Sequence, residues 1–480
     1  MKAGLSPEVY GIEDERTMLV TRQGETSVET VGSCHSPDVK LGLYQEPESA
    51  PVNGSEVSTM RHGLRAIGVD SDPAGHLSNG GRYYMDPSGP EYATAEHRSA
   101  EGAVHASFIG DVLHGLACQA LIDDSESNVI AVQNNRANVD HAGTSRGVHQ
   151  NTVTTLAELD EGEIQVLAML NVAKAALVGS GGLLVDGDGQ THFHHSPRLS
   201  VTNSLWAKYS NYQDRPLVRV PLKEDVGGLN RVETITSDAL SFGYPMKMSQ
   251  LFTKAGLWLL EMGKADQLPV LNDSIAAAHA VGRYGYNCEI EIRMPTGSVR
   301  SIRPLQLVSA VTKYMGGVDE KFHVMNEKTR LAIADFGEMA RMVDENPLNG
   351  FGQVESITRE TLMHERLTRR FNRVDLNSEQ ACRFDYWWSE TKKGFAKHLR
   401  EAKGYGWRGF EEGYNPKAYA QRLVAPPADT RAAIRGAFIA EIKGRRAVDW
   451  HQLVSRSGSV ADLHPLQCDP RTVRWQPRRR

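Results

Sequence analysis

The stretch "RYYMD" at residues 82–86 has two different faces if it forms a β-strand. Alternate side chains of a strand point to opposite sides of the sheet, so Arg82, Tyr84 and Asp86 would share one side. The two residues between them, a tyrosine and a methionine, would lie on the other side. A cation, a hydroxyl and a carboxylate together on one face of a sheet predict a functional site there.

The other elements that the sequence indicates are a mixture of helices and strands. Apolar residues at four-residue steps predict a helix over 99–121, and a second helix is expected over about 162–178, before the glycines of "VGSGG". Strands are expected in "VYGIEDERTMLV" and at 128–135, 216–221, 231–236 and 287–294, and the pattern is mainly helical over 304–402. Because there is no regular strand–helix–strand rhythm, an α+β fold with an antiparallel sheet is favoured.

Size and charge limit the class of protein. A chain of 480 residues with 40% hydrophobic content can hold one large core and a smaller second domain. The net charge of −5 argues against a general nucleic-acid binder, and the apolar runs are too short to predict a membrane span. The five cysteines are far apart and include no C-x-x-C pair, which predicts reduced thiols and a cytoplasmic protein.

Two other patterns suggest sites and are rejected. "GYGWRG" at 404–409 fits the G-x-G-x-x-G motif of dinucleotide-binding proteins, but that motif needs a preceding strand and "ETKKGFAKHLREAK" is expected to be helical. The sequence also contains no P-loop pattern. The histidines of "THFHHS" (His192, His194 and His195) have no distant cysteine or carboxylate partner in the pattern, which favours a place at the surface or a role in supporting other side chains over a metal site.

Two acidic residues near the start, Glu13 and Glu15 of "GIEDE", would share one face of a strand. One interpretation is an exposed, charged edge strand. The other is a Mg²⁺ site, because hard cations prefer carboxylate oxygens on a rigid support. Together with Glu91 and with the face that carries Arg82 and Tyr84, these carboxylates favour chemistry on ATP and Mg²⁺, in which the arginine steadies phosphate charge.

Four blocks of sequence follow one another in a specific order. They are "GIEDE", "NGGRYYMD…PEYATAE", "NN…GTSRGVHQN" and "PPADTRAAIRG…VDW". This ordered set resembles the Pup ligase and Pup deamidase (depupylase) family, from about residue 10 to 470. The resemblance implies a glutamine-synthetase-like domain over 1–410, with a concave antiparallel sheet backed by helices, and a small C-terminal domain over 411–480. The long polar stretch 21–79 is expected to be a flexible insertion.

The resemblance also implies roles for individual residues, carried over through the matching motifs. The implied Mg²⁺ ligands are Glu13, Tyr84 and Glu91, with Glu15 as a further acidic residue of the metal site. The implied ATP contacts are Arg82, Thr94 and Trp450, and the implied catalytic base is Asp86. In the ligases of this family, ATP phosphorylates the C-terminal glutamate of the small protein Pup, and a substrate lysine attacks the acyl phosphate. A base is needed because that lysine is protonated at neutral pH.

Three of these assignments have structural alternatives. Asp86 precedes a proline and would instead cap the turn "DPSGP". Trp450 would instead be a core residue that anchors the small domain. Glu91 and Thr94 are an odd number of positions apart, so a regular strand would place them on opposite faces. The chain must therefore bend between them if both belong to one site.

The sequence departs from the family pattern at several positions. Arg16 and Thr17 follow the first Glu-x-Glu in place of an aromatic residue and a glycine. Gln150 replaces a glutamate that is expected near the nucleotide, and Glu233 replaces a histidine. The spacing from the implied base to Glu91 is one residue shorter than in the family. These departures leave the ATP and Mg²⁺ core in place and leave the donor and the acceptor open.

Four functions are therefore considered. The main prediction is a ligase that resembles Pup–protein ligase, with a Pup-like modifier and a lysine-bearing protein as partners, and "GIE" and "EYATAE" favour it. The long stretch 21–79 favours an ATP-dependent depupylase or Pup deamidase instead. A phosphotransferase or small-molecule carboxylate–amine ligase that does not use Pup is a third possibility. The fourth is a pseudoenzyme that binds a nucleotide without turnover.

Overall fold

The structure of this chain is a computed structural model. It describes residues 5–22, 54–86, 89–124, 129–136, 147–209, 214–220, 222–224, 227–411, 419, 422–442 and 448–477. Within these ranges, no helix is long and apolar enough to cross a membrane.

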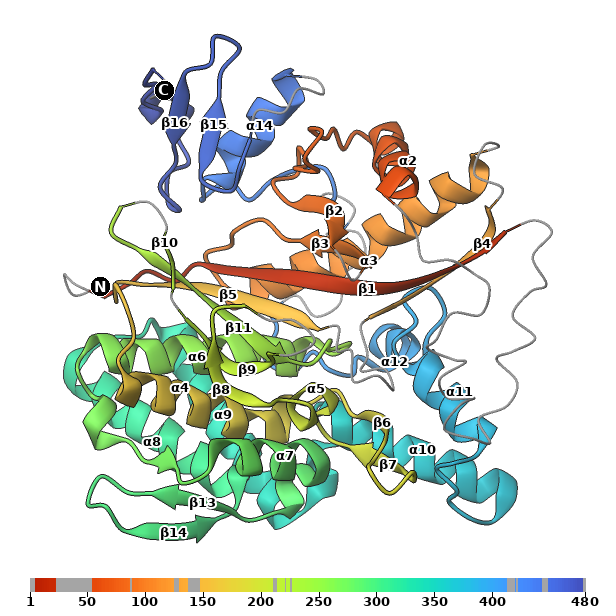
Figure 1. Cartoon of the computed structure of the whole chain (residues 1–480), viewed down its shortest axis with the longest axis vertical. Helices are drawn as coiled ribbons and strands as arrows, with labels where there is room; N and C mark the ends of the chain where they lie inside the picture. The colour runs from red at the N-terminus through yellow and green to blue at the C-terminus, as the bar shows by residue number, and fades with distance from the viewer. Residues whose placement is uncertain are drawn as a thin grey trace.

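A seven-stranded antiparallel sheet lies at the centre of the molecule (Figure 1). Six strands follow the order β10-β11-β5-β1-β3-β2, and β4 pairs with the second half of β1. The strands are β1 (Tyr10–Arg22), β2 (Arg82–Asp86), β3 (Gly89–Ala93), β4 (Val129–Arg136), β5 (Val148–Thr154), β10 (Lys223–Glu224) and β11 (Asn230–Ser237). Every pair in this sheet is antiparallel, so the predicted α+β class is confirmed.

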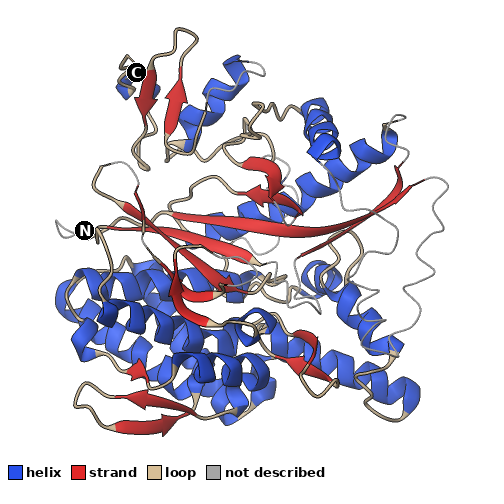
Figure 2. Ribbon diagram, in the orientation of Figure 1, coloured by secondary structure: helices blue, strands red, loops and turns tan. Residues whose placement is uncertain are grey.

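One face of the sheet is covered by helices (Figure 2). The helices that contact its strands are α3 (Ala100–Asp123), α4 (Glu161–Val178) and α6 (Gly243–Glu261). On β1, Ile12 and Asp14 are buried on this side, and Ser107 of α3 donates a hydrogen bond to the Asp14 carboxylate. Since alternate residues of a strand face opposite sides, Glu13 and Glu15 lie on the other face of the sheet.

The helices that the sequence predicted are confirmed, and local signals set their starts. The hydroxyl of Ser99 accepts a hydrogen bond from the Gly102 N–H at the beginning of α3. Asp160 and Glu163 form a capping box at the start of α4. The predicted helical region continues as α8 (Pro304–Phe322), α9 (Glu327–Glu345), α10 (Glu355–Phe371), α11 (Glu379–Trp388) and α12 (Phe395–Lys403). Because "GYGWRG" follows helix α12 and not a strand, it lacks the context of a dinucleotide-binding motif.

Shorter elements complete this part of the chain. An antiparallel pair (β6 with β7), a parallel pair (β8 with β9) and a three-stranded sheet lie outside the central sheet. Their strands are β6 (Gly182–Val185), β7 (Thr191–His194), β8 (Ser204–Ala207), β9 (Pro216–Arg219), β12 (Val270–Leu271), β13 (Ile290–Arg293) and β14 (Val299–Ile302). The remaining helices here are α5 (Pro197–Ser200) and α7 (Ser274–Tyr284). Strand β9 lies beside β11 and brings Arg219 to the central sheet.

The stretch 21–79 is only partly what the sequence suggested. Residues 21–22 belong to β1, and residues 23–53 lie outside the described part of the chain. Helix α2 (Gly54–Leu64) packs on α3, and its Met60 and Leu64 are fully buried. The contact is close, because a Cβ atom at Gly63 would lie 2.1 Å from that of Ala120. Residues 59–79 are therefore part of the packed core and not an insertion outside it, since Met60, Leu64, Val69 and Leu77 are fully buried.

The C-terminal residues form a small unit on the side of the sheet opposite α4 and α6 (Figure 1). It contains α14 (Ala432–Ile442), β15 (Gln452–Val454) and β16 (Val460–Asp462), with a small hydrophobic cluster of its own. The cluster includes Ile434, Ile439 and Leu453. The domain boundary at residue 410 stays a prediction.

Candidate active site

The face of the sheet that the helices leave uncovered carries a row of acidic side chains from adjacent strands. Glu15 of β1 is the cross-strand partner of Glu91 on β3, and Glu91 is in turn the partner of Tyr84 on β2. Side chains of directly opposed residues lie on the same face of a sheet. The register therefore brings three of the predicted metal-site residues together, as the sequence pattern suggested.

Glu91 is buried beside the half-buried side chain of Tyr84. Among the described residues, no cation directly contacts the oxygen atoms of these two side chains. The Tyr84 hydroxyl donates a hydrogen bond to Glu91, whose side chain is only 2% exposed. Burial, and then the nearby charge of Glu13, raises the pKa of Glu91 well above its usual value. Burial also raises the pKa of Tyr84, and the Arg82 guanidinium lies 4.1 Å from the centre of the Tyr84 ring. Such a carboxylate is stabilised by a proton or by a bound cation.

Glu13 belongs to a second cluster, with His149 of β5 and Glu233 of β11. The Nδ1 atom of His149 lies 3.4 Å from a carboxylate oxygen of Glu13 and 3.2 Å from one of Glu233. Their ligand atoms all lie within 4.8 Å of one another, which makes this a candidate metal centre among the described residues. Burial alone would lower the pKa of His149, but hydrogen bonds with Glu13 and Glu233 raise it well above its usual value. A divalent cation would replace that proton as the positive charge of the cluster.

Cationic side chains border this cluster on the side of β10 and β11. Arg231 lies 3.3 Å from Glu13, Arg219 lies 2.6 Å from Glu233, and Lys223 also pairs with Glu233. Burial would raise the pKa of Glu233, but the hydrogen bond with His149 and the charge of Lys223 lower it strongly. The open face thus has an acidic centre with a basic edge, an arrangement that suits a metal-bound polyphosphate.

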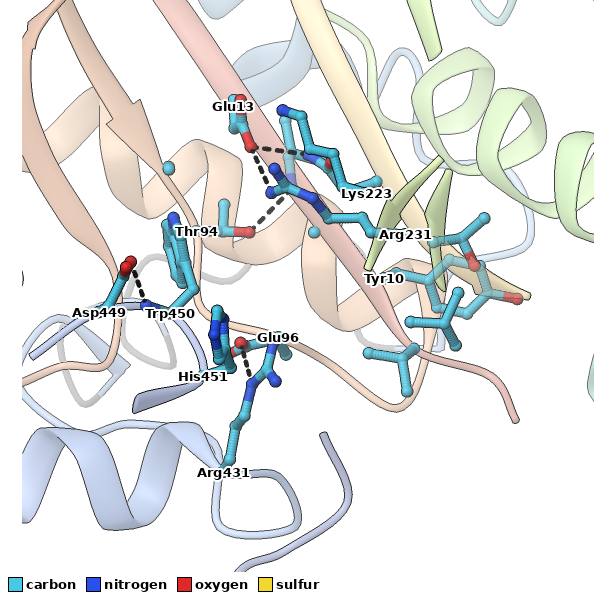
Figure 3. Close-up of a pocket in the computed structure, with 17 residues that line it drawn as sticks. Tyr10, Glu13, Thr94, Glu96, Lys223, Arg231, Arg431, Asp449, Trp450 and His451 are labelled. Carbon is cyan, nitrogen blue, oxygen red and sulfur yellow. Dashed lines mark hydrogen bonds and ion pairs between the residues drawn. The ribbon is translucent and has the colours of Figure 1, made fainter. Parts of the chain in front are cut away.

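A cavity of about 260 Å³ lies beside this edge, between the sheet and the C-terminal unit (Figure 3). Glu13, Thr94 and Trp450, all predicted site residues, line it together with Lys223 and Arg231. Thr94 follows the last residue of β3, and its hydroxyl accepts a hydrogen bond from the Ile12 N–H at 3.0 Å. Because the chain has left the strand by then, Thr94 reaches the cavity despite its odd spacing from the acid on β3.

Glu15 and Asp86 are two further predicted site residues on the strands of the sheet. Glu15 accepts a hydrogen bond from the Gly147 N–H and lies 4.0 Å from His149 Nε2. It is therefore near the second cluster, as expected. Asp86 is the last residue of β2 and the cross-strand partner of Gly89. Its side chain lies outside the described part of the structure, so its role as the base stays a prediction.

The comparisons with known proteins agree with this architecture. Residues 9–454 match the family model described as Pup-ligase protein. The chain belongs to the Pup-ligase family. Curated relatives include the Pup–protein ligase of Acidimicrobium ferrooxidans, 25% identical over 472 residues, which cover 94% of this chain and 93% of that protein. The Pup–protein ligase of Renibacterium salmoninarum is 25% identical over 453 residues, 87% of this chain and 90% of that protein.

Two solved structures of the family share the fold. The ligase PafA in complex with the prokaryotic ubiquitin-like protein Pup has a TM-score of 0.74 and 17% identity, over 96% of this chain and 90% of that one. PafA in complex with ADP has a TM-score of 0.68 and 16% identity, over 88% of this chain and 92% of that one. The α+β fold with an antiparallel sheet, expected from the resemblance to this family, is confirmed.

Two of the departures from the Pup-ligase pattern, Gln150 and Glu233, have different consequences in the structure. Gln150 points toward α6, where the Ser249 hydroxyl donates a hydrogen bond to its Oε1 at 2.7 Å. We expected this substitution to remove an acid near the nucleotide. Because neighbouring residues of β5 alternate, His149 and Asn151 contact Glu13 while Gln150 lies on the side of the helices, and its effect on the nucleotide stays a prediction. Glu233, in contrast, lies in the cluster itself.

Sequence reasoning missed several charged residues of the site. His149 was noted only as part of a family block and Glu233 only as a departure from the family pattern, and Arg231, Lys223 and Arg219 were not among the predicted site residues. The alternation of "RVE" on a strand was the available signal for Arg231 and Glu233. The histidines of "THFHHS" lie elsewhere, and His194 pairs with Asp186 at 3.0 Å on the β6–β7 hairpin.

Proposed function

We propose that this chain is an ATP- and Mg²⁺-dependent ligase that joins a carboxylate of a Pup-like modifier protein to a lysine of a second protein. The observation that carries the proposal is the row of carboxylates, with one histidine, on the open face of the sheet beside a cavity with a basic edge. Membership of the Pup-ligase family supports the reaction class. The related ligase PafA forms a complex with Pup, which supports a Pup-like modifier as the partner here.

The residues of the open face fit a metal site. Tyr84 and Glu91 are one proposed pair of metal ligands. Glu13 lies between this pair and the cluster with His149 and Glu233, and Glu15 lies beside that cluster. Among the described residues, no cation directly contacts the buried carboxylate of Glu91, whose pKa is raised, and oxygen ligands suit Mg²⁺. When bound there, Mg²⁺ would neutralise phosphate charge during transfer.

The cavity is proposed to hold the nucleotide. Trp450 would pack against the base, Thr94 would lie along the nucleotide, and Arg231 would face the phosphates. Arg82 does not line the cavity: it lies over the Tyr84 ring and donates a hydrogen bond to the Ala74 carbonyl, and we propose that it reaches the phosphates from β2. The modifier's carboxylate oxygen then attacks the γ-phosphorus, the bond to ADP breaks and an acyl phosphate forms. The lysine amine attacks the acyl carbon, the carbon–oxygen bond to phosphate breaks, and the amine gives up its proton. We assign that proton to Asp86.

The proposal includes the cellular compartment. The described cysteines (Cys118, Cys288, Cys382 and Cys468) are free thiols. Free thiols are typical of a reducing compartment and support a cytoplasmic enzyme.

Product analysis tests the proposed function. The purified chain is incubated with ATP, Mg²⁺, a Pup-like protein that ends in glutamate and a lysine-bearing acceptor protein. The expected result is an adduct whose mass is the sum of the two proteins less one water, with one ADP released for each adduct. Loss of mass from a preformed conjugate, with no adduct formed, would favour the depupylase alternative. Nucleotide binding without ADP release would identify a pseudoenzyme.

A change at Trp450 tests the position of the base. We expect Trp450→Ala to raise the Michaelis constant for ATP about tenfold, because aromatic–base stacking contributes about 1–3 kcal/mol in comparable sites. The melting temperature should change little, since the side chain is only partly buried at the cavity wall. An unchanged Michaelis constant with a large fall in melting temperature would identify Trp450 as a core anchor instead.

A further inference from the structure

We infer that Arg435 of α14 is a positioning residue that holds together two segments lining the nucleotide cavity, at Glu96 and Trp450, and ties them to a third segment at Gly80. The inference rests on the proposed function, because it assumes that the nucleotide lies against Trp450. Arg435 is fully buried and is not itself among the residues that line the cavity. It therefore acts through the residues that it holds.

The guanidinium of Arg435 contacts all three segments at once. Its NH1 donates a hydrogen bond to the Trp450 carbonyl at 2.7 Å, and its NH2 donates to the carbonyl of Gly80. The same group forms a forked ion pair with the two carboxylate oxygens of Glu96, at 3.1 and 2.7 Å. It also lies 4.8 Å from the centre of the Trp450 ring.

Each of these contacts is next to a proposed nucleotide-binding residue. Gly80 is two residues before Arg82, Glu96 is two residues after Thr94, and the third contact is Trp450 itself. One planar guanidinium, with donors in a fixed fork, can set the distances between these segments. The three N–H donors of lysine radiate from one nitrogen and cannot reproduce a fork whose acceptors lie at two separate nitrogens.

The partner of Arg435 is held in its charged form. Burial would raise the pKa of Glu96, but the charges of Arg435 and Arg431 keep it far below its usual value. Glu96 lines the cavity and follows the strand that carries the metal-site acid. Ion pairs with Glu96 therefore connect the C-terminal unit to the central sheet at the proposed nucleotide cavity, in addition to apolar packing.

A double-mutant cycle tests the inference. Arg435→Met, Trp450→Ala and the double variant are compared by calorimetric titration with ATP and by steady-state kinetics. We expect Arg435→Met to raise the dissociation constant for ATP about tenfold, with the turnover number at saturating ATP within about twofold of the wild type. Since Trp450 is the contacted residue that would stack on the base, most of the effect of losing Arg435 should disappear in the Trp450→Ala background, and only a smaller part, through the Glu96 segment, should remain.

Two further variants separate positioning from stability. Arg435→Lys keeps a positive charge beside Glu96, so it should recover melting temperature but not ATP affinity. Arg359 is the matched control, because it is also buried, pairs with Asp385 at 2.8 Å, donates to the Gly181 carbonyl and lies 5.6 Å from the Trp388 ring. Arg359→Met should lower the melting temperature and leave the dissociation constant for ATP unchanged.

The outcomes distinguish this inference from the proposed function. If Trp450→Ala weakens ATP binding and Arg435→Met does not, or if their effects are additive, the positioning role is wrong. It is also wrong if Arg435→Lys restores ATP affinity, since a charge alone would then suffice. If Trp450→Ala leaves ATP affinity unchanged, the proposed nucleotide position fails and the inference fails with it. Should Arg435→Met not fold, Arg435→Lys replaces it in the same cycle.

Discussion

Replacing Asp86 by asparagine should lower the rate of the overall transfer by about 10²–10⁴-fold, the usual range for the loss of a general base. The amide has nearly the shape of the carboxylate but cannot take the proton of the attacking lysine. ATP binding should stay near normal, because the proposed nucleotide contacts come from Arg82, Thr94 and Trp450. The measurement is single-turnover transfer at saturating ATP, with the dissociation constant for ATP determined separately.

The alternative for Asp86 is a turn residue before a proline. In that case Asp86→Asn would retain more than about a tenth of the wild-type rate where chemistry limits turnover, and its main effect would be on stability. The dependence on pH gives a second readout. A general base loses activity as the pH falls through its pKa, so the acidic limb of the wild-type rate profile should be absent in the variant.

Replacing Glu13 by glutamine should reduce ATP turnover by about 10³-fold or more, since a lost metal ligand removes several kcal/mol of charge stabilisation. Glu13 is the residue that the two acidic clusters share. Its charge contributes to the raised pKa of Glu91, and its carboxylate contacts His149 and Arg231. The affinity for Mg²⁺, or for Mn²⁺ as a spectroscopic substitute, should fall in parallel, and binding of the metal is measured without turnover.

The control for Glu13→Gln is Glu8→Gln, a few residues earlier in the chain. Glu8 is also largely buried, but it accepts hydrogen bonds from Thr329 and Asn326 of the α9 region. Its substitution should affect stability and leave metal affinity unchanged. If Glu13→Gln binds the metal as tightly as the wild type, the open face of the sheet is not the metal site.

The sequence predicted the parts of the site that lie on one strand or on two strands joined by a short turn. Alternation correctly placed Glu13 and Glu15 on one face. The motif of β2 and β3 brought Tyr84 to Glu91, because a short hairpin connection fixes its own register. Regular apolar spacing likewise predicted α3 within a few residues of its observed ends.

Pairing between distant strands could not be derived in this way. His149 meets Glu233 only because β5 pairs with β11, and the strand order that brings them together is set by the whole fold. The packing of residues 59–79 on the core was not predicted for a related reason, since Met60 and Leu64 are isolated apolar residues in a polar stretch. Their burial against α3 is a tertiary effect that local periodicity does not reveal. No local sequence pattern predicts the role of Arg435, because the three residues that accept its hydrogen bonds, Gly80, Glu96 and Trp450, belong to separate segments of the chain.

The central claim is that the open face of the sheet transfers a phosphoryl group to a carboxylate before the lysine attacks. The most direct measurement uses a Pup-like protein whose C-terminal glutamate carries oxygen-18 in its side-chain and terminal carboxylates. In a complete reaction with ATP, Mg²⁺ and the acceptor protein, the account predicts that one labelled oxygen appears in inorganic phosphate for each adduct formed. Adduct formation with unlabelled phosphate, or phosphate release that does not depend on the modifier, would contradict it.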